Sequence, residues 1–165
     1  MIHIERDPDS VPEVLTSEWA KEASDQLWDT FYRQQEGRQE AFPFRPRIWQ
    51  AVAGPLMELF HEKCAYCETP LSKETYLDVD HHRPKAIYWW LAYEWENLYP
   101  ICTQCASYKG TSFPVIGKPA EPGQKGQDLL DERALLLDPC LDEPSEWLHF
   151  EDNGFVDSTL GATEE

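Results

Sequence analysis

The chain has 165 residues, of which 41% are hydrophobic and 13% aromatic, so it can build a folded core and lacks the composition of a disordered protein. No apolar run approaches the ~18 residues of a membrane span, and the first residues do not form a signal peptide. A cytoplasmic protein with no membrane partner is therefore expected. The net charge of −17 argues against nucleic-acid binding through a generally basic surface.

The acidic charge is unevenly distributed along the chain. Residues 61–125 carry seven Lys and Arg against eight Asp and Glu, and residues 1–60 carry six against eleven. Residues 126–165 carry one against twelve. Such an acidic tail is usually a solvated surface, but it can also dock a basic partner or keep the chain away from non-specific DNA.

Two helical patterns come first. Apolar residues recur at helical spacing from Ser17, a suitable N-cap, to about Arg33, and a second pattern runs from residue 48 to residue 60. The Gly54-Pro55 pair predicts a kink or a restart in the second helix. We expect residues 1–60 to be a helical region that packs on the rest of the chain.

The pattern then changes to short strands and loops. Residues 75–80 alternate and predict a strand that ends at Asp80 and His81. A short helix is expected from near Cys105 to Gly110. An irregular loop (117–128) and later strands (135–139 and 147–150, with a turn at 152–154) should follow.

The chain therefore divides into the helical region, a motif-bearing core at 61–116, and a loop with an acidic extension at 117–165. It ends without a closing element, as a fragment of a longer protein would.

The most informative motif is a pair of Cys-x-x-Cys sequences, Cys64/Cys67 and Cys102/Cys105. Four cysteines paired in this way suit a structural zinc ion, which ties together the ends of a long irregular insert. Two disulfides, or redox-active pairs, are alternative interpretations that a reducing compartment makes less favourable. Cys140 stands alone and is expected to be a plain buried residue.

Between the two motifs lies the segment Asp80-His81-His82-Arg83-Pro84-Lys85. A carboxylate beside a histidine suits a second, catalytic metal ion next to a general base. The sequence thus predicts a structural clamp and a candidate active site in one segment.

These residues, with Trp95-Glu96-Asn97-Leu98 and the Lys109 that follows the second cysteine pair, carry a resemblance. The chain resembles the HNH nuclease family, and within it the HNH subunits of Septu and retron-associated anti-phage defence systems. The resemblance implies an α+β fold with a ββα-metal (His-Me finger) core. It also implies DNA as the substrate and an ATPase subunit as a partner.

The resemblance further implies a role for each residue. His81 would be the general base, Asp80 would hold Mg²⁺ or Mn²⁺, and Asn97 would brace the loop that orients His81. Phosphate contacts would come from three cations, Arg83, Lys85 and Lys109. A second register, with His81 as the ligand and His82 as the base, is an alternative that the Arg-Pro-Lys sequence after His82 disfavours.

The chain departs from the family at one position. The family has Asn or His directly after the last zinc cysteine as a second metal ligand, whereas this chain has Ala106. An engineered substitution, a naturally weakened enzyme, or replacement by Ser107 or His82 would each explain it. Two functions therefore stay open, a weakened metal-dependent endonuclease and an inert zinc-stabilised binding or assembly module.

Overall fold

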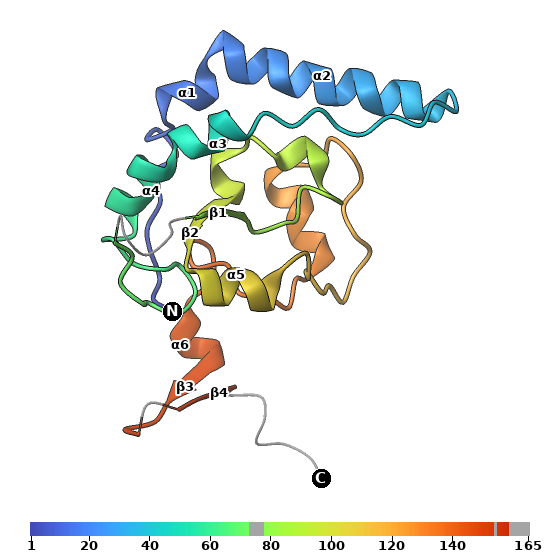
Figure 1. The fold of residues 1–165 in the computed structure, drawn as a ribbon. Coiled ribbons are helices and arrows are strands. Elements are labelled where there is room, and N and C mark those ends of the chain that lie inside the picture. The colour runs from blue at the N-terminus through green and yellow to red at the C-terminus, as the bar shows by residue number, and fades with distance from the viewer. Residues whose placement is uncertain (73–77, 154, 159–165) are drawn as a thin grey trace.

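The computed structural model describes residues 1–72, 78–153 and 155–158. Figure 1 shows the long helix α2 lying across one side of the chain, the β1–β2 pair with α5 near the centre, and the β3–β4 pair extending away from them. The helices and strands are α1 (Glu13–Thr16), α2 (Glu18–Gln35), α3 (Pro46–Ala51), α4 (Ala53–Leu59), β1 (Asp78–His81), β2 (Leu98–Ile101), α5 (Thr103–Lys109), α6 (Pro144–Trp147), β3 (Leu148–Phe150) and β4 (Val156–Ser158). Three 3₁₀ helices join them at Trp89–Leu91, Trp95–Asn97 and Gly126–Glu132.

The first predicted helix is confirmed. Ser17 caps α2 by accepting a hydrogen bond from the amide of Ala20. The second pattern is split into α3 and α4 at Val52, two residues before the predicted Gly-Pro break. The reason lies in Pro55, which has no N–H to offer the carbonyl of Ala51 and whose ring collides with that carbonyl, so the helix ends at Ala51 and restarts.

The centre of the fold is the predicted ββα arrangement. Strands β1 and β2 pair antiparallel, with Asp80 opposite Tyr99 and His81 opposite Leu98. Helix α5 follows β2 directly and ends at Gly110, which has a positive φ of 50°. The α+β class and this core are confirmed, whereas residues 73–77, the first part of the predicted strand, lie outside the described residues.

One aromatic core joins the helical region to the ββα unit. Trp89, which follows the β1 loop, stacks on Phe31 and Phe42 with ring centroids 5.1 and 4.9 Å apart. Trp28 of α2 meets the same ring edge-on at 4.7 Å. Residues on both sides of residue 60 therefore share one buried cluster.

The C-terminal predictions are partly wrong. Residues 135–139 form no strand, and Pro139 lacks an N–H for strand pairing. The nearest pairing is an isolated bridge between Ala134, just before the segment, and Val115. Strand β3 pairs with β4 around the predicted turn, of which Gly154 lies outside the described residues. Within the part of the chain that the structure describes, none of the helices has the length and apolar character needed to cross a bilayer.

Candidate active site and zinc cluster

The four motif cysteines meet at one point. Their sulfur atoms all lie within 4.8 Å of one another, and Cys67 Sγ is 3.7 Å from Cys102 Sγ. A zinc ion with four sulfurs at about 2.3 Å needs sulfur–sulfur edges of about 3.8 Å. A disulfide would need about 2.05 Å. The donor set and its spacing therefore fit a tetrahedral zinc ion.

Hydrogen bonds favour the thiolate form of Cys67, whereas burial raises the pKa values of Cys64 and Cys105. The amide of Cys102 points at Cys64 Sγ and the amide of Cys105 at Cys102 Sγ, each at 3.4 Å. Burial raises the pKa of Cys67, but the hydroxyl and amide of Thr69 and the neighbouring thiols outweigh it and lower this pKa to about 7. Hydrogen bonds of this kind stabilise the anionic ligands that zinc requires.

His81 lies in a pocket of about 310 Å³ that Asp80, Lys85 and Ala106 also line. Its Nε2 is 3.0 Å from the carbonyl oxygen of Ala92. A carbonyl can only accept, so Nε2 carries the proton and Nδ1 keeps its lone pair. Burial, helped by the charges of Lys85 and Lys109, lowers the pKa of His81 to about 3. The imidazole is thus neutral at pH 7, but a pKa this far below the working pH also makes it a weak proton acceptor.

Two aromatic side chains hold the His81 ring in place. Trp49 of α3 meets the imidazole edge-on, with centroids 5.0 Å apart. Tyr93 stacks on Trp49 at 5.9 Å, and its hydroxyl accepts a hydrogen bond from the amide of Arg45. The helical region therefore builds one wall of the candidate active site.

Asp80 is already paired within the protein. The hydroxyl of Tyr66 donates to Asp80 Oδ2 at 2.7 Å. Lys109 Nζ lies 3.1 Å from Oδ1 and 3.0 Å from Oδ2, and it also donates to the carbonyl of His81 at 2.9 Å. Only 12% of the Asp80 side chain and 8% of the Lys109 side chain are exposed. Lys109, which the sequence predicts to contact phosphate, is directed at Asp80 in the structure.

The residues around Asp80 do not fit a hard divalent cation. Such ions take oxygen ligands, and Mg²⁺ is usually bound through one or two carboxylates. Here Asp80 is neutralised by an ammonium group, and Ala106 brings a methyl group to the pocket. The other carboxylate of the lining, Asp78, is exposed and accepts a hydrogen bond from the amide of Val79. Ser107 is exposed and does not line this pocket. Among the described residues, the four cysteines are the one cluster of His, Cys, Asp or Glu that could hold a metal ion.

Asn97 forms hydrogen bonds with Arg83 in the loop after β1 and with the turn at Leu91. Its Oδ1 accepts from the amide of Arg83 at 2.7 Å, and its Nδ2 donates to the carbonyls of Arg83 and Leu91 at 3.0 and 3.1 Å. The side chain is buried between the loop after β1 and the 3₁₀ turn at Leu91. These bonds fix the loop that begins at His81.

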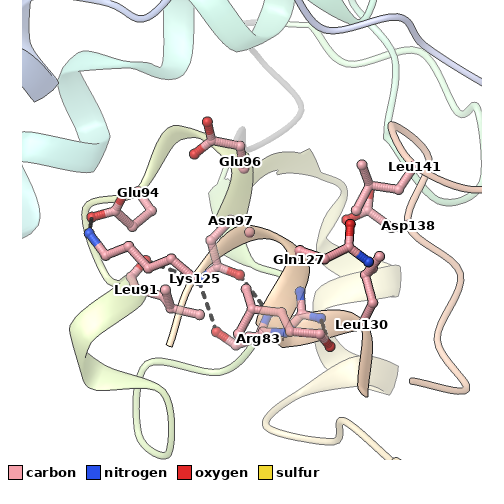
Figure 2. A pocket seen from close by; sticks show the side chains of 12 residues that line it. Arg83, Leu91, Glu94, Glu96, Asn97, Lys125, Gln127, Leu130, Asp138 and Leu141 are labelled. Carbon is pink, nitrogen blue, oxygen red and sulfur yellow. Dashed lines mark hydrogen bonds and ion pairs between the residues drawn. The ribbon is translucent and has the colours of Figure 1, made fainter. Parts of the chain in front are cut away.

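Arg83 is not brought together with Asp80 and His81. Its Nε donates to Glu132 at 2.8 Å, and its guanidinium lies over the Phe113 ring at 5.1 Å. Figure 2 shows it with Asn97 at the wall of a different pocket, of about 440 Å³. The larger cavity is thus away from the Asp–His pair. The guanidinium of Arg83 is buried and paired with Glu132, and it does not line the pocket of His81.

His82 and Lys85 also have clear positions. His82 is almost fully buried, stacks on Tyr66, and does not line the pocket of His81. The alternative register therefore lacks geometric support. Lys85 does line that pocket, with its Nζ 5.3 Å from the Trp49 ring centroid.

Sequence reasoning missed the partners of the predicted site residues. Tyr66 forms a hydrogen bond with Asp80. Trp49 and the carbonyl of Ala92 contact His81. Glu132 pairs with Arg83. Tyr66 lies between Cys64 and Cys67, so the sequence indicates that it is near the site but not that its side chain points at Asp80. The others are distant in sequence and gave no local signal.

Comparisons with known proteins agree with this geometry. The HNH endonuclease family model matches residues 64–112, the segment from the first zinc cysteine to just beyond α5. The chain is 33% identical to the Septu protein PtuB of Bacillus mycoides (strain KBAB4) over 135 residues, which is 73% of this chain and 45% of that protein. It is 44% identical to the Septu protein PtuB of Bacillus thuringiensis over 57 residues, 34% of this chain and 22% of that protein.

A different Septu protein also matches. The chain is 34% identical to PtuA of the same Bacillus mycoides strain over 110 residues, 59% of this chain and 15% of PtuA. The chain thus spans less than half the length of each of these relatives. No solved structure gives a significant match. With the ββα core and the four-cysteine cluster, these matches identify residues 64–112 as an HNH endonuclease domain, in a chain that is similar to the Septu protein PtuB.

Proposed function

We propose that this chain acts as the HNH-type DNA endonuclease of a bacterial anti-phage defence system, and that the chain as it stands cleaves DNA weakly or not at all. The observation that carries the proposal is a single pocket lined by His81, Asp80 and Ala106. His81 keeps an Nδ1 lone pair for a proton, while the position that family members use for a second metal ligand carries only a methyl group.

His81 is the residue that would activate water. Its Nε2–H bond to Ala92 leaves the Nδ1 lone pair free to take a proton, and the low pKa keeps the ring neutral near pH 7. The protonated imidazole would then be retained near the newly formed phosphate. A phosphodiester entering the pocket would meet the ammonium group of Lys85, which lines it.

Asn97 acts as a positioning residue in this proposal. Asn97 joins the loop after β1 to the carbonyl of Leu91. Two residues after Leu91 comes Tyr93, which stacks on Trp49. Orientation of the His81 ring therefore depends on Asn97 through the surrounding backbone. Lys109 and Arg83 would act on the substrate only if they left their carboxylate partners.

A plasmid-nicking assay tests the proposal. The chain would be compared with Ala106→Asn, each with bound zinc and with added Mg²⁺ or Mn²⁺. We expect nicking to increase in the Asn variant and to disappear when His81→Ala is added to it. An Ala106→Asn variant that keeps its zinc and fold but gains no nicking would contradict the proposed cause of weak cleavage. Nicking that survives His81→Ala would come from another site.

A second function is favoured by the Asp80–Lys109 pair and by Ala106. A chain that keeps the HNH fold without its chemistry would be a zinc-stabilised module for binding or assembly. In that case Ala106→Asn would gain no activity, while His81→Ala would leave partner binding unchanged. The same assay, combined with a pull-down by the partner subunit, separates the two functions.

The acidic charge motivates a further part of the proposal. With −17 net charge and one cation among residues 126–165, the chain has little affinity of its own for DNA at long range. We propose that it works in the cytoplasm, where its thiols stay reduced, and that an ATPase subunit brings it to DNA. A single-turnover assay of the Ala106→Asn variant, with and without that subunit, should show faster nicking with the subunit present.

A further inference from the structure

We propose that the ammonium group of Lys109 is the resident counter-ion of Asp80, and that it takes the place of the divalent cation in the pocket of His81. The inference deepens the proposed function and rests on it for the identity of the pocket. It concerns only which cation neutralises the buried carboxylate of Asp80.

The hydrogen bonds of Asp80 already occupy both of its carboxylate oxygens. A carboxylate offers about four lone-pair positions. Lys109 Nζ contacts both oxygens, at 3.1 and 3.0 Å, and the Tyr66 hydroxyl takes a further position on Oδ2. A divalent ion would have to displace a cation that is already at hydrogen-bonding distance.

The side chain of Lys109 is buried and fixed from two directions. With 8% of its side chain exposed, this lysine is held within the fold rather than drawn to Asp80 from solvent. A second bond, to the carbonyl of His81 at 2.9 Å, fixes the ammonium group from another direction. Helix α5 ends at Lys109 itself, so the charge also lies at the favourable end of the helix dipole.

The remaining lining of the pocket offers a divalent cation little compensation. Ala106 lies one helical turn before Lys109 and lines the same pocket. The Ala106 side chain donates nothing to a metal ion, and Asp78, the other carboxylate that lines the pocket, is exposed to water. A divalent cation at Asp80 would therefore gain only a solvent-exposed carboxylate in return for displacing the ammonium group. The structure therefore assigns the charge balance of this pocket to a lysine.

Manganese binding to the zinc-loaded chain tests this assignment. Free Mn²⁺ is measured by its electron paramagnetic resonance signal during titration, without DNA. We expect no site tighter than the millimolar range in the original chain, and Lys109→Met to tighten binding by at least about tenfold, because removing a like charge within ~4–6 Å has effects of that size. Adding Asp80→Asn to Lys109→Met should remove the gain. Lys85→Met, which removes the same charge from the same pocket without touching Asp80, should give a much smaller change.

The inference is overturned if the original chain binds one Mn²⁺ at micromolar concentration and Asp80→Asn abolishes that binding. It is also overturned if folded, zinc-loaded Lys109→Met binds Mn²⁺ no better than the original chain. Because no DNA is cleaved, failure of the nuclease proposal would leave these outcomes unchanged.

A second measurement serves if Lys109→Met does not fold. Lysine acetylation by a water-soluble ester, mapped by mass spectrometry, should spare Lys109 in the original chain and modify it in Asp80→Asn. Asp78→Asn is the matched control, because Asp78 is an exposed carboxylate two residues earlier on β1. Acetylation of Lys109 in the original chain as fast as that of Lys118, whose side chain is 79% exposed, would contradict the assignment.

Discussion

Replacing Asn97 by Asp should destabilise the fold more than replacing it by Ala, although Asp has the same shape. Asn97 accepts one bond from the Arg83 amide and donates two, to the carbonyls of Arg83 and Leu91. Truncation to Ala loses three bonds worth about 1 kcal/mol each, and so about 3 kcal/mol. Asp keeps the accepted bond but turns a charged oxygen towards two carbonyls at a site that is 4% exposed.

Urea unfolding with zinc in excess, followed by tryptophan fluorescence, measures the difference. We expect a loss of about 3 kcal/mol for Asn97→Ala and a larger loss for Asn97→Asp, with the extra loss shrinking at acid pH as the new carboxyl is protonated. Asn153→Asp, at an exposed turn, should change stability by less than about 0.5 kcal/mol. An Asn97→Asp variant as stable as the original chain would show that the amide donors do not brace the loop.

Two further predictions concern the zinc cluster and the backbone. Cys105→Ala should lose zinc and unfold, because a structural zinc ion contributes on the order of 10 kcal/mol to folding. Elemental analysis measures the zinc content, and the control Cys140→Ala should keep about one zinc per chain. Equal zinc loss in both variants would refute the four-cysteine cluster. Gly117→Ala should destabilise the fold by at least about 2 kcal/mol in thermal unfolding, since its Cβ would lie 2.3 Å from the carbonyl oxygen of Asp131. Gly54→Ala, which meets nothing within 4 Å, is the control, and similar losses in both would contradict the steric reason.

The predictions that succeeded from sequence have local causes. Spacing alone indicates the cysteine knuckles, because two residues between ligands are enough to turn the chain around one ion. Ser17 and Gly110 mark helix ends through the chemistry of their own side chains and backbone. The wrong strand at 135–139 had suitable apolar residues but no partner strand, and pairing is a tertiary property.

The sequence by itself indicated the candidate residues: four cysteines, one Asp–His pair, and an alanine directly after the last motif cysteine. Only the tertiary structure decided how their charges are used. Arg83 and Lys109 are cations in the right segment, yet one is paired with Glu132 and the other with Asp80. Burial is the physical reason, since a charge removed from water must find an opposite charge nearby, and which carboxylate lies nearby depends on segments up to 49 residues away in the chain.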